Sequence, residues 1–149
     1  GHNHFSYALY PHASDWKTAL TVRRGYDYNY KLQAMQVEAH SGTLPPEHSF
    51  ITVENKNVVL TAVKKAEDAN GIILRFYEWA GKSGNVQIQV PKGAVSATLA
   101  NLMEKPEGTA LEMTNSDQVT VPVHPYAIVT VRIDYPRHHR RQSNAPSAD

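Results

Sequence analysis

Apolar and polar residues alternate with a period of two along most of the chain after residue 49, and this pattern predicts a series of short β-strands. The predicted strands cover residues 50–54, 57–64, 72–80, 86–90, 97–102, 111–113, 118–123 and 128–133. Val86, Ile88 and Val90 alternate with glutamines, so this strand is expected to have one solvent-facing side. Short strands at this spacing favour an all-β fold, an antiparallel β-sandwich with one short N-terminal helix.

Turn-forming residues separate these strands. The Asp68–Gly71 and Gly81–Gly84 segments and the Asn115-Ser116-Asp117 run carry the glycine, asparagine and aspartate residues that tight turns prefer. Asn55-Lys56 predicts a hairpin between the first two strands, with a weaker signal because it lacks glycine.

The first forty residues combine three strand-like runs with one helical run. Ser14 is predicted to cap a short helix that contains Trp16 and ends at Gly25, because apolar residues there recur at helical spacing. The strand-like runs are residues 4–12, 26–32 and 35–39, with a bulge expected near Gln33.

Composition shifts divide the chain into four parts. Residues 1–40 are expected to be the last strand or strands and the helix of a preceding β-rich domain, and residues 41–48, with two prolines and a glycine, a linker. Residues 49–135 are the predicted C-terminal β-sandwich, and residues 136–149, which lack an apolar anchor, a disordered tail. Because the chain opens with Gly1 just before a strand-like run, we expect it to be part of a longer protein or a processed product.

The overall composition excludes several classes of partner. The 149 residues carry a net charge of +1, and their main basic cluster lies at residues 137–141, so no nucleic-acid partner is expected. No apolar run approaches the length of about 18 residues that a membrane span needs, so no membrane is expected either. The absence of cysteine rules out disulfides and thiolate metal sites; it is compatible with the cytoplasm and leaves localisation open.

Three groups of residues invite a chemical role. Glu78 stands among aromatic residues, which can raise the pKa of a carboxyl group, but no partner carboxylate is identifiable and a structural hydrogen bond is favoured. Tyr26, Tyr28 and Tyr30 would share one face of a strand, where they could stack on a sugar or pack. The eight histidines lack metal-ligand spacing and are interpreted as incidental.

Six stretches, in this order, resemble the C-terminal β-domain region of α-mannosidases of glycoside hydrolase family 38. They are HFSYALYPHASDW (4–16), TVRRGYDYNYKL (21–32), NVVLTAVKKAED (57–68), GIILRFYEWAG (71–81), ATLANLMEK (97–105) and VPVHPYAIVTVRI (121–133). The chain departs from the family pattern at Ser6, where threonine is usual, and at Ser14, where glycine is usual.

The resemblance implies a retaining α-mannosidase with an aspartate nucleophile and one divalent metal, commonly zinc, both in the N-terminal and central domains. None of the family's nucleophile or metal-ligand motifs matches this chain, so no catalytic or metal-binding residue is assigned. The implied function is that of a C-terminal scaffold of an enzyme that hydrolyses terminal α-D-mannosides. Its partners would be the other domains of that parent and, through the parent, an α-mannoside; this chain alone is expected to be inactive.

Four residues remain as candidates for facing the substrate or a neighbouring domain: His12, Trp16, Arg24 and Tyr28. For His12, a hydrogen bond within its turn is the favoured interpretation. The alternative function is a stand-alone, non-catalytic sandwich that binds carbohydrate or another protein. A packing module without a ligand is a third possibility, and it would show an apolar patch left open for other domains.

Overall fold

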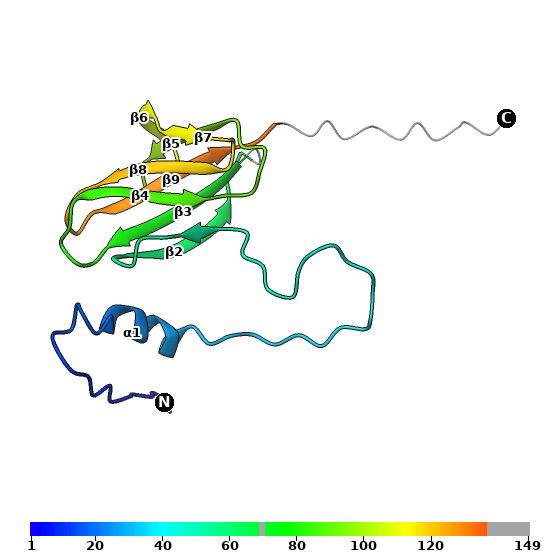
Figure 1. Ribbon diagram of the computed structural model, residues 1–149. Coiled ribbons are helices and arrows are strands. Elements are labelled where there is room, and N and C mark those ends of the chain that lie inside the picture. The colour runs from blue at the N-terminus through cyan, green and yellow to red at the C-terminus, as the bar shows by residue number, and fades with distance from the viewer. Residues whose placement is uncertain (69–70, 137–149) are drawn as a thin grey trace.

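The structure is a computed structural model that describes residues 1–68 and 71–136. In these residues one helix, α1 (Thr21–Asn29), precedes nine strands, and the helix lies beside the two stacked sheets, outside the sandwich itself (Figure 1). The strands are β1 (Thr52–Val53), β2 (Val58–Lys65), β3 (Gly71–Glu78), β4 (Gly84–Gln89), β5 (Ser96–Ala100), β6 (Pro106–Ala110), β7 (Glu112–Thr114), β8 (Gln118–Val123) and β9 (Ile128–Asp134).

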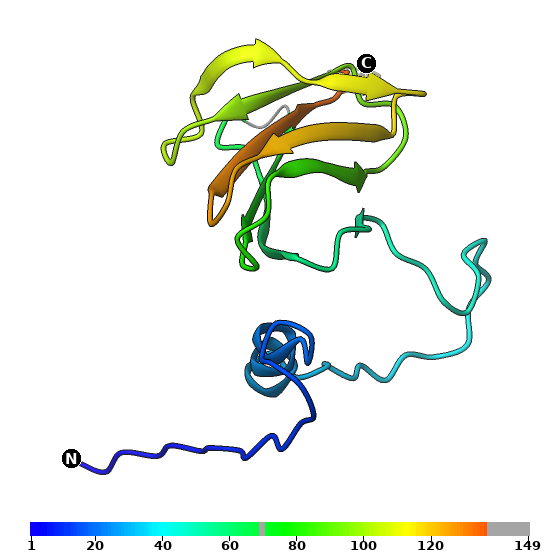
Figure 2. The same cartoon turned by 60° about the vertical axis from the view of Figure 1, so that its left-hand side comes forward.

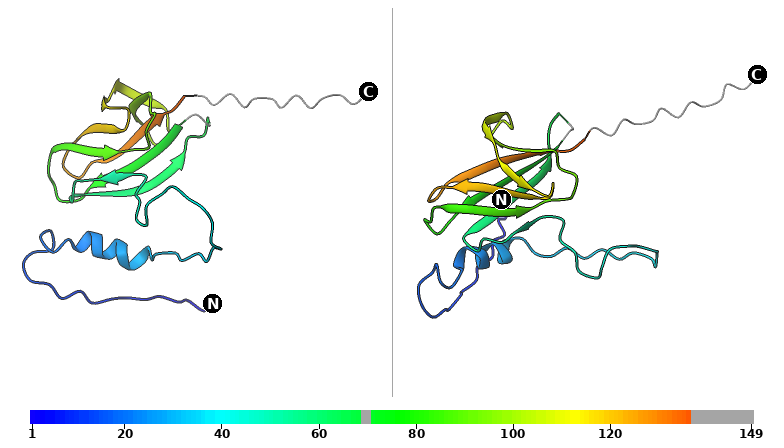
Figure 3. Two further views of the ribbon diagram at one scale, coloured as in Figure 1. Left: turned by 45° about the vertical axis from the view of Figure 1, so that its right-hand side comes forward. Right: turned by 45° about the horizontal axis from the view of Figure 1, so that its top comes forward.

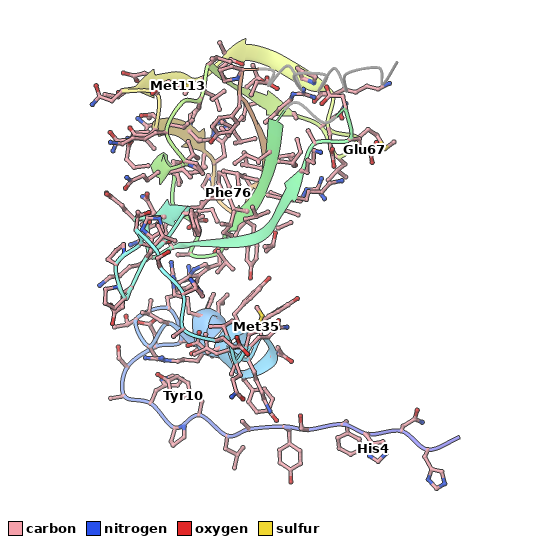
Figure 4. The ribbon with its side chains drawn as sticks, turned by 90° about the vertical axis from the view of Figure 1, so that its right-hand side faces the viewer. His4, Tyr10, Met35, Glu67, Phe76 and Met113 are labelled. Carbon is pink, nitrogen blue, oxygen red and sulfur yellow. The ribbon has the colours of Figure 1, made fainter. Side chains whose placement is uncertain are left out.

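The strands form two antiparallel sheets that face each other (Figure 2). One sheet has the order β1-β4-β8-β7 and the other the order β2-β3-β9-β5-β6. The core between them is built from the inward-facing residues of both sheets, including Leu74, Phe76, Ile88 and Val131, which are fully buried. Figure 4 shows Phe76 inside the sandwich. The predicted all-β sandwich with one short N-terminal helix is confirmed.

Several local predictions are confirmed in detail. On β4, Val86 and Ile88 are buried whereas Gln89 is exposed, so this strand does have one wet face. Asn115 and Ser116 have positive φ angles of 53° and 56°, the pair of left-handed residues that a tight hairpin turn requires, and they join β7 to β8. The periodicity did not predict β6, which begins at Pro106 and pairs only with β5, as suits a proline-initiated edge strand.

The hairpin predicted at Asn55-Lys56 is wrong. β1 pairs with β4 in one sheet, whereas β2 pairs with β3 in the other, so the connection crosses between the layers. The Asn55 side chain stays with the first sheet, where its Oδ1 accepts from the Gln87 backbone N–H at 3.1 Å and its Nδ2 donates to the Asn85 carbonyl oxygen at 3.2 Å. Without a glycine to allow the primed turns, the two residues make a crossover.

The three strands predicted before residue 40 do not form. Residues 4–12 and 35–39 carry no helix or strand, and residues 26–32 contain the end of α1 instead. In the views of Figure 3, the segment before the helix and the one after it run along and away from the sandwich. A strand needs a partner to satisfy its backbone, and no described strand pairs with these runs, so their alternation alone does not produce a sheet.

The helix is also displaced relative to its prediction. Asp15, not Ser14, accepts the capping hydrogen bonds, from the backbone N–H groups of Lys17 and Thr18 at 2.8 and 3.0 Å. These bonds close a turn that ends at Leu20, which has a left-handed φ of 55° and precedes the first residue of α1. Gly25, predicted as the terminator, lies inside the helix.

Local side-chain pairs explain why residues 21–29 are helical despite their alternating tyrosines. Arg24 and Asp27 form an ion pair at 3.3 Å with a spacing of three residues. The rings of Tyr26 and Tyr30, four residues apart, stack at 5.4 Å. Such i,i+3 and i,i+4 pairs stabilise helices and are unavailable in a strand.

Two predictions concern other parts of the chain. Most of the predicted disordered tail, residues 137–149, lies outside the described residues. No helix among the residues described is long and apolar enough to cross a membrane.

Candidate functional site

The helix and the turn before it pack on the outer face of the five-stranded sheet. The contact lies at the edge of the sheet where β3 ends and β2 begins. Val59, Trp79 and Ala80 form a second buried cluster there, separate from the sandwich core. The residues packed against this cluster are Leu20, Val22, Tyr26 and Tyr77. We call this contact between residues 15–30 and the sandwich the junction; Figure 4 shows the helix against this side of the sandwich.

Trp79 is the central apolar residue of the junction. Its side chain is only 5% exposed and lies against Trp16, with ring centroids 5.9 Å apart. Its indole N–H donates to the Lys56 carbonyl oxygen at 3.2 Å, and its backbone N–H donates to the Asn57 carbonyl oxygen at 3.0 Å. The indole therefore has both its apolar surface and its one donor satisfied.

Arg23 attaches α1 to the crossover between β1 and β2. Its Nε donates to the Lys56 carbonyl oxygen at 2.9 Å, and its Nη2 donates to the carbonyl oxygens of Asn55 and Val58 at 3.1 and 2.9 Å. A planar guanidinium can serve three acceptors in a fixed arrangement, which a lysine ammonium cannot reproduce.

We expect Arg23→Lys to loosen the helix from the sandwich. Losing part of the three-carbonyl contact should cost about 1–2 kcal/mol, so the α1 amides should exchange hydrogen roughly 5 to 30 times faster. Arg24→Lys is the matched control, because Arg24 is exposed, its contacts with Tyr10 and Asp27 do not reach the sandwich, and its substitution should change exchange little. Equal effects of the two substitutions would contradict this role of Arg23.

Lys17 makes a further contact across the junction. Its ammonium group donates to the Ala80 carbonyl oxygen at 2.6 Å and to the Tyr126 hydroxyl at 3.3 Å. The same group lies 5.7 Å from the centroid of the Tyr126 ring. Lys17 thereby links the turn before α1 to two loops of the sandwich, the one after β3 and the one between β8 and β9.

The carboxylate of Glu78, which is 1% exposed, lies beneath these loops and accepts four hydrogen bonds. Oε1 accepts from the Asn57 side-chain amide at 2.9 Å and from the Ala80 backbone N–H at 2.8 Å. Oε2 accepts from the backbone N–H groups of Gly81 and Tyr126 at 2.7 and 3.0 Å. The carboxylate thus fixes the start of β2 and both loops that Lys17 contacts.

These contacts decide the ionisation of Glu78. Burial by itself would raise the pKa of the carboxyl group, but the hydrogen bonds from Tyr126, Asn57, Ala80 and Gly81 outweigh it and lower the pKa to about 2. A group with that pKa is ionised at neutral pH and cannot donate a proton as a general acid there. The structural hydrogen bond favoured for Glu78 is confirmed.

Gly81 is required by the close approach of Tyr126. Gly81 has a φ of +76°, and a Cβ built on it would lie 2.5 Å from the Tyr126 hydroxyl oxygen. Any side chain would therefore strain the left-handed backbone of Gly81 and push the Tyr126 ring away. Residues 78–81, which carry part of the family resemblance, thus have structural roles in packing and hydrogen bonding.

The four candidate residues fall in different surroundings. His12 is exposed, with Nδ1 3.2 Å from the Ser14 carbonyl oxygen, so the expected contact within its turn is present. Trp16 belongs to the junction, whereas Arg24 makes an exposed pair with Asp27. Tyr28 is half-buried. No hydrogen bond, ion pair or ring contact in the described chain joins any two of the four, so they do not form one site.

The residues that build the junction were largely missed by sequence reasoning. Lys17 and Trp79 received no role, Arg23 was considered only as an arginine near the tyrosines that could bind a sugar hydroxyl, and the nearby Glu78 was recognised only as an acid among aromatic residues. The sequence does not distinguish Arg23 from Arg24, because only the helical phase turns one toward the sandwich. The sequence offered one indication of this site, a glutamate next to a tryptophan at the end of a buried strand.

The three tyrosines do not share a face, because they lie on a helix and its C-terminal cap instead of on a strand. The stacked pair Tyr26 and Tyr30 lies on one side, and Tyr26 also contacts Tyr77 of β3, with ring centroids 6.4 Å apart. Tyr28, between them in sequence, points elsewhere on the helix. The expected strip is replaced by a cluster of Tyr26, Tyr30 and Tyr77.

The divalent metal that the resemblance implies does not fit the residues at hand. Within residues 1–68 and 71–136, no group of three or more histidine, aspartate or glutamate side chains converges as ligands. Glu78 and Glu104 are the two buried carboxylates of this part of the chain. Glu78 is saturated by hydrogen bonds and Glu104 is paired with Lys64, so neither offers a free ligand.

The fold and the junction together define an antiparallel β-sandwich domain with a docked N-terminal segment. Within that class, the chain belongs to the glycosyl hydrolases family 38 C-terminal beta sandwich domain, whose family model matches residues 57–131. The resemblance inferred from the sequence motifs is thereby confirmed.

Two curated relatives extend the match beyond the sandwich. "Alpha-mannosidase G" of Dictyostelium discoideum is 24% identical over 136 residues, which are 89% of this chain and 12% of that protein. "Putative mannosylglycerate hydrolase" of Halalkalibacterium halodurans is 26% identical over 134 residues, 90% of this chain and 14% of that protein. The chain therefore spans a small part of either relative, and both matches include part of the segment before residue 57. No solved structure matches the chain.

Proposed function

We propose that this chain is the C-terminal support domain of a longer α-mannosidase-like glycoside hydrolase, and that it holds neighbouring domains in place. Family membership, together with the small share of each relative that the chain spans, is the observation that carries this proposal. The names of both relatives refer to mannose-containing substrates, which favours a terminal α-mannoside for the longer enzyme.

The chemistry of that enzyme would be carried by other domains. A retaining glycosidase needs two carboxyl groups about 5–5.5 Å apart, one of them able to donate a proton. Glu78 has a pKa of about 2, which leaves it unsuited to that role. The nucleophile, the acid and the divalent metal, zinc in our proposal, would therefore reside in the remainder of the longer protein.

The proposed domain organisation follows the division expected from the sequence. Residues 1–40 would complete a preceding β-rich domain, residues 41–48 would be a linker, and residues 49–135 the C-terminal sandwich. Large apolar side chains that a folded protein would cover are exposed before the sandwich: Phe5 is 86% and Leu9 is 89% exposed. Their alternation suits strands that pair with partners from the rest of the longer enzyme, and these partners supply the backbone contacts that residues 4–12 lack here.

The proposal predicts that the 149-residue chain does not hydrolyse 4-nitrophenyl α-D-mannopyranoside above the uncatalysed rate, with or without added Zn²⁺. Release of nitrophenolate followed by absorbance measures this, with an active α-mannosidase as the positive control. Turnover that co-purifies with the chain and is abolished by Glu78→Gln would contradict the support role.

A further inference from the structure

A shallow groove lies beside the junction, between the helix and β3. It has a volume of about 680 Å³. Its lining residues are Val22, Gly25, Tyr26, Asn29, Tyr30 and Tyr77, and we call it the tyrosine groove. None of these six residues is charged, so the groove suits a neutral ligand better than an ionic one.

Three tyrosine rings form the aromatic surface of the groove. The rings of Tyr26 and Tyr30 are nearly parallel, with an angle of 13° between them, and Tyr77 lies at 43° to Tyr26. Tyr30 is 74% exposed, so the ring face turned away from Tyr26 is open to a ligand. A flat, rigid and amphipathic ring offers contact area at little conformational cost.

Polar groups accompany this surface. Asn29 donates its side-chain N–H to the Gly25 carbonyl oxygen at 2.8 Å, which orients the amide and leaves its Oδ1 with no hydrogen-bond partner among the described residues. Gly25 adds no side chain, and a Cβ there would meet open space, so a ligand can approach the helix backbone. Burial, and secondarily a hydrogen bond with Tyr26, raises the pKa of Tyr77 to about 12, so its hydroxyl is protonated at neutral pH and its oxygen can accept a hydrogen bond from a ligand.

The groove is held in shape before any ligand arrives. Arg23 fixes the helix through three backbone carbonyl oxygens, and Val22, Tyr26 and Tyr77 pack on the Trp79 cluster. A surface that is already ordered loses little freedom on binding, which favours even a small ligand.

We propose that the tyrosine groove binds one pyranose unit of a neutral oligosaccharide, with the sugar ring on the open face of Tyr30 and its hydroxyls on Asn29 and Tyr77. A pyranose has an apolar C–H face and a rim of hydroxyl groups that both donate and accept, which matches an aromatic ring bordered by an amide and a phenol. This site is additional to the support role, and its failure would leave that role untouched.

The test is a titration of the 149-residue chain with α-mannobiose and, separately, with cellobiose, followed by amide NMR shifts. Binding in the millimolar range is expected for a single stacked ring, with shifts confined to the groove. Tyr30→Ala should weaken it at least about tenfold, whereas Tyr30→Phe should retain most of it. Tyr7→Ala is the matched control, since Tyr7 is exposed and does not line the groove.

The proposal is supported if either disaccharide binds saturably and if the affinity falls with Tyr30→Ala but is largely kept with Tyr30→Phe and Tyr7→Ala. Absence of saturable binding of both disaccharides, or binding that Tyr30→Ala leaves unchanged, would overturn it. Self-association of the chain through the groove without sugar binding would also overturn it.

Discussion

Glu78→Gln is expected to destabilise the protein by about 3 kcal/mol at neutral pH, a larger effect than that of the polar substitutions at Arg23 and Arg24. The wild-type carboxylate accepts four hydrogen bonds, two on each oxygen. A glutamine must place an amide N–H₂ group against two of those donors, so buried N–H groups lose their acceptor. Urea denaturation of the variant and the wild type at pH 7 measures the difference.

The same substitution should also change the acid limb of the stability profile. The folded-state pKa of Glu78 is depressed from 4.5 to about 2, so its contribution is complete above about pH 4.5 and is lost as the pH falls towards 2. Glu78→Gln should therefore flatten the stability profile over this interval. Glu112→Gln is the matched control, because Glu112 is exposed on β7 and should alter neither stability nor its pH dependence. An unchanged acid limb in Glu78→Gln would show that the carboxylate is not held ionised.

Trp79→Ala is expected to release residues 15–30 from the sandwich. Truncating a buried tryptophan costs about 3–5 kcal/mol, and here the loss falls on the cluster that holds the helix. Because proteolysis follows the population of the opened form, tryptic cleavage at Lys17, Arg23 and Arg24 should accelerate by roughly a hundredfold or more. Mass spectrometry of the products identifies the sites, and the strands of the sandwich should remain protected.

Trp16→Ala is the matched control for this prediction. Trp16 lies on the other side of the same ring contact but is about half-exposed, so its truncation should accelerate cleavage much less. If the two variants are cleaved equally fast, Trp79 is not the central residue of the junction. If Trp79→Ala unfolds the whole sandwich, the junction and the sandwich form one cooperative unit.

The sandwich could be predicted from sequence because its strands are buried on one face. Along β4 the alternation of Val86 and Ile88 with glutamines encodes which side faces the core. The Asn115-Ser116 turn could also be predicted, because a left-handed backbone conformation favours a few residue types such as asparagine. β6 was missed because an edge strand that starts with Pro106 carries neither signal.

The N-terminal segment could not be predicted in the same way. Tyr26, Tyr28 and Tyr30 satisfy a period of two, yet Tyr26 and Tyr30 also satisfy the four-residue spacing of a helix, and both their stacking and the packing of the helix on the Trp79 cluster favour the helix. The runs at residues 4–12 and 35–39 do alternate, but pairing depends on partners that the sequence of this chain does not supply. Pattern alone therefore overestimated strand content before residue 40.

The junction was hidden for a different reason. Arg23 donates hydrogen bonds to main-chain carbonyl oxygens. Every residue has such an acceptor, so the sequence does not show which residues Arg23 contacts. Lys17 likewise contacts the carbonyl oxygen of Ala80, sixty-three positions away. Of the four candidates, His12 came from a turn within the family resemblance, whereas Trp16, Arg24 and Tyr28 came from their residue types, and residue type does not reveal which side of a helix meets the sandwich.

Whether the buried carboxylate supports structure or performs acid–base chemistry is tested most directly by its own titration. The carboxyl ¹³C shift of Glu78, followed by NMR against pH in the 149-residue chain, reports the pKa without relying on a substitution. A support domain built as described predicts a pKa of about 2. A pKa at or above the ordinary value of 4.5 would show that the four hydrogen bonds do not hold the carboxylate ionised, and would contradict the structural role assigned to Glu78.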